Sequence, residues 1–113
     1  MKKDIDIEKL KEEIVERLKP LNPDKIILFG SYASGNPDED SDIDLYVVTN
    51  DDFMPQSFRE KINIKLNVAK ALDNIRDSYP LDLIVHTKKM NEKFLKLNSS
   101  FSREIFDKGE VLK

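Results

Sequence analysis

Residues 41–48 read Ser-Asp-Ile-Asp-Leu-Tyr-Val-Val, and this stretch decides the fold. Its apolar second half is typical of a buried β-strand. Side chains alternate between the two faces of a strand, so the carboxylates of Asp42 and Asp44 share one face. The opposite face carries the apolar side chains Ile43, Leu45 and Val47. Because Asp is disfavoured within strands, two of them on one face indicate a functional site.

Two acidic residues separated by one position are, by themselves, a weak signal. The chain has 22 acidic residues among its 113, so about four such pairs are expected by chance. The strand around Asp42 and Asp44 makes this pair different. Their Cα atoms lie roughly 6.6 Å apart on a strand, so the carboxylates can converge on cations about 3.5–4 Å apart. Without a cation, carboxylates about 5 Å apart repel by roughly 3 kcal/mol at an effective dielectric constant near 20.

The expected counter-ion is Mg²⁺, with Mn²⁺ as the alternative. The chain has no cysteine and one histidine, His86, which excludes cysteine-based zinc sites and sites with several histidines. Hard carboxylate oxygens are the ligands that Mg²⁺ and Mn²⁺ prefer.

A third acidic residue, Asp82, interrupts another apolar stretch between Leu81 and Leu83. A single Asp in a strand is more often an edge residue or a strand-end cap. If the strand over 81–85 neighbours the strand over 41–48, however, Asp82 joins Asp42 and Asp44 in a three-carboxylate cluster. Three acids, two metal ions and one nucleotide are the working parts of nucleotidyl transfer.

The remaining pattern predicts helices and strands around these acids. Apolar periodicity, caps and breakers predict helices over 7–18, 57–76, 88–97 and 100–107, a helical turn over 32–34, and strands over 25–29 and 111–112. Ser57 and Glu60 form a capping box at the start of the 57–76 helix. That helix is apolar on two sides, and its second side fits either the core or a partner. The length of 113 residues fits one domain, 1–113.

Gly30-Ser31 directly follows the strand over 25–29. Glycine lets the backbone approach a phosphate closely, and Ser31 adds a hydroxyl donor. Alone this is an ordinary loop dipeptide, and its value comes from its position ahead of the acidic strand. Two other residues have plainer interpretations: Tyr32 is expected to pack, and His86 is expected to be structural or exposed.

The order and spacing of these motifs resemble a known family. Phe-Gly-Ser (29–31), ten residues, Asp-Ile-Asp (42–44) and a later Leu-Asp-Leu (81–83) resemble the DNA polymerase β-like nucleotidyltransferase superfamily. By size the chain is similar to the minimal nucleotidyltransferases (MNT), and among them to the antitoxin of HEPN/MNT toxin–antitoxin pairs. The resemblance implies an α/β (α+β) fold, with a small mixed sheet flanked by helices as in the polymerase β-like palm.

The resemblance also implies roles for the residues that match. Gly30 and Ser31 would hold the triphosphate, and Asp42 and Asp44 would ligate two Mg²⁺ ions. Asp82 would ligate one metal and activate the acceptor hydroxyl. The implied reaction transfers AMP from ATP, or another nucleoside triphosphate, to a tyrosine of a small helical HEPN toxin encoded nearby. Many relatives carry a basic residue at the position where this chain has Ser34. The resemblance therefore implies either weaker nucleotide binding or a positive charge supplied by another residue.

Two other functions remain open at this stage. One is a non-catalytic antitoxin that neutralises its partner by binding, and the other is nucleotidyl transfer to a small molecule such as an aminoglycoside. The net charge of −3 argues against direct nucleic-acid binding. The polar N-terminus and the lack of an apolar run of about 20 residues predict a cytoplasmic protein without a membrane segment. Residues 38–40 are expected to be a solvated acidic loop.

Overall fold

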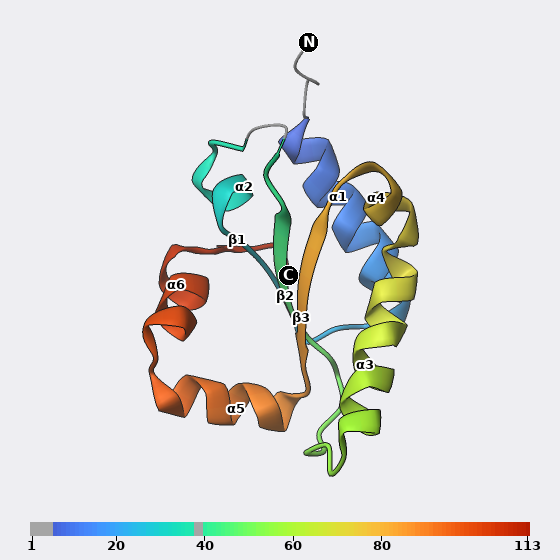
Figure 1. The fold of residues 1–113 in the computed structure, drawn as a ribbon, viewed down its shortest axis with the longest axis vertical. Helices are drawn as coiled ribbons and strands as arrows, with labels where there is room; N and C mark the ends of the chain where they lie inside the picture. Colours follow the sequence, from blue (N-terminus) through green and yellow to red (C-terminus); the bar gives the residue numbers. More distant parts are fainter. Residues whose placement is uncertain (1–5, 38–39) are drawn as a thin grey trace.

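The computed structural model describes residues 6–37 and 40–113 of the chain. Asp38 and Glu39 of the predicted acidic loop lie outside the described residues. The described sheet has the strand order β3-β2-β1-β4 (Figure 1). Its strands are β1 (Lys25–Phe29), β2 (Ile43–Val48), β3 (Leu81–His86) and β4 (Glu110–Val111). β1 is antiparallel to both β2 and β4, whereas β2 and β3 are parallel, so the sheet is mixed as expected.

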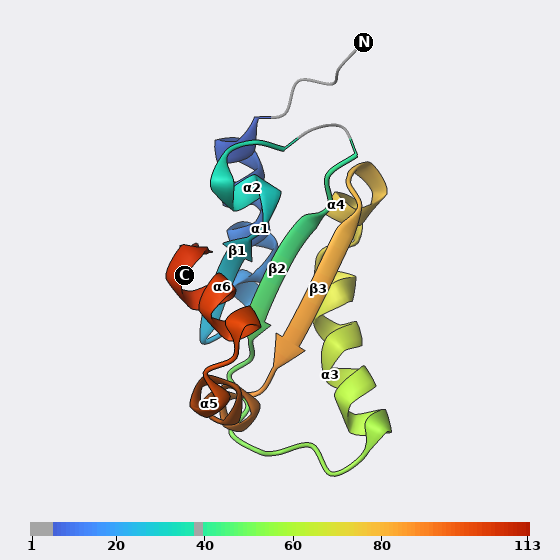
Figure 2. The same cartoon turned by 60° about the vertical axis from the view of Figure 1, so that its left-hand side comes forward.

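Helices lie on both faces of this sheet (Figures 1 and 2). They are α1 (Ile7–Leu18), α2 (Ser31–Ser34), α3 (Phe58–Ala71), α4 (Asp73–Ser78), α5 (Lys88–Leu97) and α6 (Ser100–Lys108), with a 3₁₀ turn over Lys19–Leu21. α1, α3 and α4 cover one face, and α5 and α6 cover the other. The predicted α/β class is confirmed. No helix within the described residues is long and apolar enough to cross a bilayer.

The alternation predicted for β2 is confirmed by its packing. Ile43, Leu45 and Val47 are fully buried in the core shared with α1 and α3. Tyr46 and Val48 belong to the second core, on the opposite face under α5 and α6. Asp42 and Asp44 therefore lie on the same face as Tyr46, beyond the end that the second core fills.

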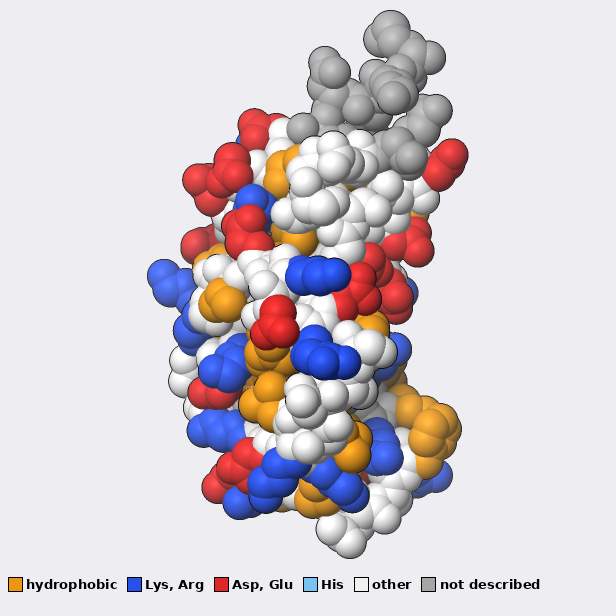
Figure 3. All heavy atoms as spheres, turned by 90° about the vertical axis from the view of Figure 1, so that its left-hand side faces the viewer, with side chains coloured by type: hydrophobic (Ala, Val, Ile, Leu, Met, Phe, Trp, Pro, Cys, Tyr) orange, Lys and Arg blue, Asp and Glu red, His pale blue; other side chains and the backbone are white. Residues whose placement is uncertain are grey.

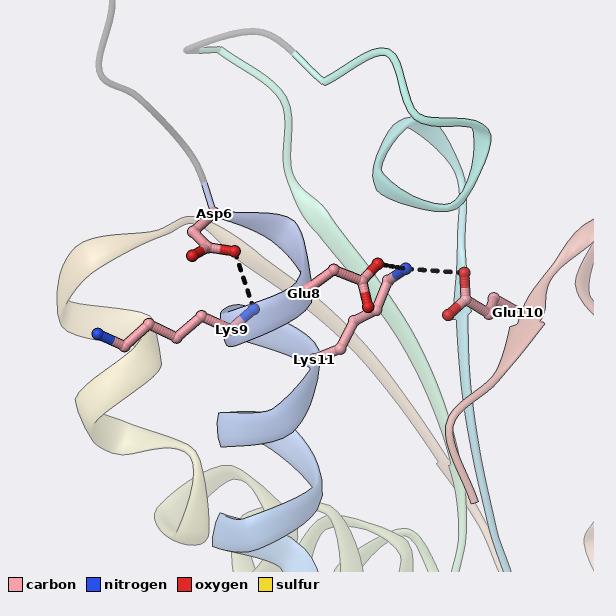
Figure 4. Close-up of polar contacts among 5 residues, drawn as sticks. All are labelled: Asp6, Glu8, Lys9, Lys11 and Glu110. Carbon is pink, nitrogen blue, oxygen red and sulfur yellow. Dashed lines mark hydrogen bonds and ion pairs between the residues drawn. The ribbon is translucent and has the colours of Figure 1, made fainter.

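The predicted helix starts are confirmed by hydrogen bonds at their caps. The Ser57 hydroxyl accepts from the Glu60 amide at 3.2 Å. The Glu60 carboxylate accepts from the amide of Gln56 rather than from Ser57, which differs by one residue from the expected capping box. At the start of α1, Asp6 accepts from the Lys9 amide at 3.1 Å (Figure 4).

One predicted helix is wrong in its extent. The pattern predicts a single helix over 57–76, but α3 ends at Ala71 and α4 begins at Asp73. Leu72 between them has φ −103° and ψ 12°, outside helical geometry. Its side chain is fully buried, and Ile75 is also part of the core. The break redirects the chain towards β3, and only two residues separate the end of α4 from that strand.

An ion pair joins the first helix to the last strand. Lys11 of α1 donates to Glu110 of β4 at 2.9 Å and to Glu8 at 3.0 Å (Figure 4). The Lys11 side chain is largely buried, so this contact fixes the C-terminal strand beside α1. β4 in turn pairs with β1, the strand that leads into Gly30.

Candidate active site

The pairing of β2 and β3 brings two of the predicted acids together. Asp44 and Asp82 are register partners across the parallel pair. The sequence predicts the three-carboxylate cluster only if the strand of Asp82 neighbours the strand of Asp44. β3 and β2 are indeed neighbours. Phe29, the last residue of β1, is the register partner of Asp44 on its other side. Asp44 thus lies in the middle of the sheet, with Asp82 on one side and the β1–α2 turn on the other.

Gly30 is required by two features of this turn. Its φ of +74° and ψ of −150° form a combination that is essentially restricted to glycine. A Cβ at this position would lie 2.2 Å from Oδ2 of Asp44. The close neighbour of Gly30 in the structure is thus the carboxylate of Asp44, which adds a reason for glycine beyond the predicted approach to phosphate.

The carboxyl group of Asp44 has an unusual affinity for its proton. Its pKa is raised to about 6, first by partial burial and then by the negative charges of Asp82 and Asp42. A hydrogen bond from protonated Asp44 to Asp82 raises it further. The repulsion predicted from the sequence is therefore present, and a proton offsets part of it. Groups with such perturbed pKa values are concentrated at functional sites.

Glu104 of α6 is a fourth acid near Asp44 that the sequence did not reveal. Its charge also raises the pKa of Asp44, although less than the four causes above. Glu104 is exposed on a helix that carries many polar residues, so no local signal distinguishes it from surface glutamates. Only the packing of α6 beside β1 brings it to this face of the sheet.

The donor set suits a hard divalent cation, although it is not a preformed metal site. Among the described residues, no three His, Cys, Asp or Glu side chains form a ready-made group of metal ligands. Asp44 and Asp82 are register partners whose charges interact, and Asp42 is exposed just before β2. A divalent cation would offset the repulsion that raises the pKa of Asp44, so the residues fit such an ion.

The turn after β1 holds the other predicted residues. Ser31 begins α2 and is exposed, and Gly35 ends this helical turn with φ +82°. The hydroxyl of Ser34 donates to the carbonyl of Ser31 at 3.0 Å. Ser34 therefore stabilises the turn locally and supplies no positive charge. Tyr32 is buried in the core, as its packing interpretation predicts.

A buried polar cluster supports the strands beneath the acids. The fully buried hydroxyl of Tyr46 donates to Oδ1 of Asn91 at 2.8 Å and lies 2.8 Å from Nδ1 of His86. Because the single hydroxyl proton goes to Asn91, a proton on Nδ1 of His86 completes the second bond. Burial lowers the pKa of His86, helped by the charge of Lys61, so the ring is neutral at pH 7. The structural interpretation of His86 is confirmed.

Comparison with known proteins identifies the family. The sequence profile described as "Nucleotidyltransferase domain" matches residues 7–112. A protein of Methanocaldococcus jannaschii named "Putative protein adenylyltransferase MJ0604" is 36% identical over 89 residues, which cover 78% of this chain and 76% of that protein. The chain belongs to the nucleotidyltransferase domain family. The predicted nucleotidyltransferase activity is thereby confirmed at the level of the enzyme class.

Solved structures show the same fold. This nucleotidyltransferase is similar to a chain of a crystal structure described as a toxin–antitoxin with AMP-PNP, with a TM-score of 0.54 and 23% identity. The match covers 91% of this chain and 72% of that one. A mutant of the toxin–antitoxin MntA-HpeT gives a TM-score of 0.51 and 20% identity, over 91% of this chain and 71% of that chain. At such identities the likeness shows the fold alone.

Proposed function

We propose that this nucleotidyltransferase transfers AMP from ATP to a side-chain hydroxyl, a tyrosine by preference, of a small helical HEPN partner, and so acts as an antitoxin. The observation that carries the proposal is the register pairing of Asp44 with Asp82 beside Gly30. Protein adenylylation is in the name of the M. jannaschii relative, and toxin–antitoxin pairs are in the descriptions of the similar structures. The proposal treats residues 1–113 as one domain acting in the cytoplasm.

Each proposed residue has a role that its position supports. Asp42, Asp44 and Asp82 would hold Mg²⁺, which offsets charge at the triphosphate when bound. Gly30 and Ser31 would contact the triphosphate from the turn that directly adjoins Asp44. Asp82 would accept the proton of the attacking hydroxyl, because it is exposed and lies on a strand of its own.

The proposed reaction balances without any further reactant. The acceptor oxygen forms a bond to the α-phosphorus as the bond from that phosphorus to the bridging oxygen breaks. Pyrophosphate leaves with the electron pair, and the hydroxyl proton passes to Asp82. The acceptor gains one AMP, and Asp82 returns its proton to solvent.

The test uses this chain, Mg-ATP and the helical protein encoded beside it, with intact mass as the readout. The partner should gain mass in steps of one AMP. The Asp42→Asn/Asp44→Asn variant should reduce transfer at least about a hundredfold, because it loses two metal-ligating carboxylates. Asp51→Asn/Asp52→Asn is the matched control, since it makes the same charge change in an exposed loop. Undiminished transfer by the first variant would refute the metal assignment, and partner binding without any mass gain would favour neutralisation by occlusion.

A further inference from the structure

The second apolar side of α3 is exposed. Phe58, Ile62 and Leu66 follow one another at intervals of four residues, so they form one stripe along the helix. They are 77%, 39% and 48% exposed, whereas the core side of α3 is buried. The sequence leaves two interpretations of this side, core packing or partner binding. Core packing is wrong for these three residues. Three large apolar side chains in a row on a chain rich in charged side chains (Figure 3) indicate a contact surface.

The stripe adjoins the edge of the sheet. β3 is the terminal strand of the described sheet and pairs only with β2. The carbonyls of Pro80 and His86 accept from the amides of Ile43 and Thr49, on the β2 side. Alternate residues of a strand direct their backbone groups to opposite sides, so Leu81, Leu83 and Val85 direct theirs away from β2. An apolar edge strand without an internal proline or lysine is a ready template for an added strand.

A groove of about 280 Å³ runs between α3 and this edge. Ile62 and Leu66 line it from the helix, and Leu81 and Asp82 line it from the strand. By alternation the side chain of Asp82 lies on the face of Asp44, its register partner, so the groove borders the strand that carries this carboxylate.

The groove also carries positive charge. Lys65 and Arg76 line it, in a chain whose net charge is −3. Arg76 pairs with Asp73 at 3.5 Å, but both side chains are more than half exposed, so a ligand can replace this weak partner. An acidic segment with apolar side chains is the chemistry that complements the groove.

We infer that the groove between α3 and β3 binds the acceptor as an extended polypeptide segment, pairing along β3, with apolar side chains against Ile62 and Leu66 and an acidic side chain near Lys65 and Arg76. The inference rests on the proposed function and names the substrate class of that site. A segment paired along β3 directs alternate side chains to the two faces of the sheet, so a hydroxyl between the groove-facing apolar side chains lies on the face of Asp82. The triphosphate lies on the other side of Asp44, by Gly30. The acceptor then approaches the acids from the β3 edge, and the nucleotide approaches them from the β1 side.

The test uses a set of octapeptides with a central tyrosine and valines at alternating positions, carrying two Glu, two Gln or two Lys. Binding is measured without ATP, and AMP incorporation is measured separately with Mg-ATP. Wild type should prefer the Glu peptides by at least about tenfold over the Lys peptides, and Lys65→Glu/Arg76→Glu should reverse the preference. Arg17→Glu/Lys70→Glu is the matched control, because it makes the same charge change on the surface between α1 and α3.

A second pair of variants tests the apolar contact. Leu66→Glu should weaken binding of all the peptides by at least about tenfold. Leu97→Glu, at a 70% exposed leucine of α5, should leave binding unchanged. Both leucines are exposed, so both variants retain the core.

The outcomes separate this inference from the proposed function. The groove proposal would be contradicted by any of three results. These are no peptide binding, no charge reversal, or binding by Leu66→Glu that equals wild type. A homodimer that Leu66→Glu dissociates would overturn it as well, by making the stripe a contact between copies. Peptides that bind as expected but never gain AMP would support the groove and contradict protein adenylylation. AMP transfer to the helical partner that is equal for wild type and Leu66→Glu would support the function and reject the groove.

Discussion

Gly30 combines a restricted backbone conformation with close contact to Asp44. We predict that Gly30→Ala destabilises the fold by about 1–3 kcal/mol, because the new Cβ forces the turn or Asp44 to move. AMP transfer should fall more than stability alone explains, since Asp44 is displaced. Chemical denaturation and the mass assay measure the two effects.

Gly35→Ala is the matched control for this change. Gly35 has a similar positive φ of +82°, but nothing lies within 4 Å of the position of its Cβ. The variant should lose about 1 kcal/mol and keep its transfer activity. Equal activity of the two variants would show that the contact of Gly30 with Asp44 is not needed.

Asp44 makes the fold less stable as pH rises, whereas most acidic residues make a fold less stable as pH falls. Its pKa in the fold is about 6, above the ordinary 3.8, so the folded chain holds this proton more tightly than the unfolded chain. Stability from this group is present at low pH and is lost as pH rises from about 4 through 6. Relative to wild type, Asp44→Asn should gain at most about 1–2 kcal/mol between pH 4 and 7, after allowance for solvent screening. Denaturation series at both pH values measure it, and a difference that stays constant with pH would contradict the assignment.

The residues of the candidate site differ in how far the sequence predicted them. Asp42 and Asp44 could be found because alternation within one strand is a local property. The register of Asp82 against Asp44 could not, because parallel pairing depends on an intervening connection of more than thirty residues. Glu104 gave no signal, since an exposed helical glutamate is ordinary until the helix is packed.

At the level of elements, most boundaries follow from local chemistry. The exception is the helix predicted over 57–76, which breaks at Leu72. The cap at Ser57 and the breaker Pro80 bracket a stretch that is apolar at helical spacing, so one helix is the local solution. Neither glycine nor proline marks Leu72, where the helix breaks. The break follows from the place of β3 in the sheet, so tertiary structure overrides propensity there.

The contact of β2 and β3 with α5 depends on the hydroxyl of Tyr46. Tyr46→Phe removes the partner of both the buried Asn91 and the half-buried His86, and should cost about 1–3 kcal/mol. A double-mutant cycle with Asn91→Leu checks this, because the second mutation should cost less once the hydroxyl is gone. Additive losses would show that the hydroxyl and Asn91 do not stabilise one another. ATP binding should change little in Tyr46→Phe, since the cluster lies beneath the acids.

At the scale of the whole molecule, the two faces of the sheet differ in how far helices cover them. One face is closed by α1, α3 and α4, and the other is closed by α5 and α6 only over part of its length (Figure 2). The acids lie at the open end of that second face, where water reaches Asp42 and Asp82. Their mutual repulsion is a cost to the fold that a bound cation and nucleotide would remove.

Ligand binding should therefore reverse the stability order of wild type and Asp44→Asn. Without ligand at pH 7, the variant should be as stable as wild type or more so, because the repulsion around Asp44 is relieved. With Mg-ATP at a hundredfold excess over its Kd, wild type should gain about 2.7 kcal/mol, and the variant should gain little after losing a metal ligand. Melting curves in EDTA, in Mg²⁺ alone and in Mg-ATP should converge or cross. A structural Asp44 that accepts backbone hydrogen bonds would instead cost about 1–3 kcal/mol on removal, with or without ligand. An apo variant that is strongly destabilised, yet gains as much as wild type from Mg-ATP, would exclude Asp44 from the nucleotide site.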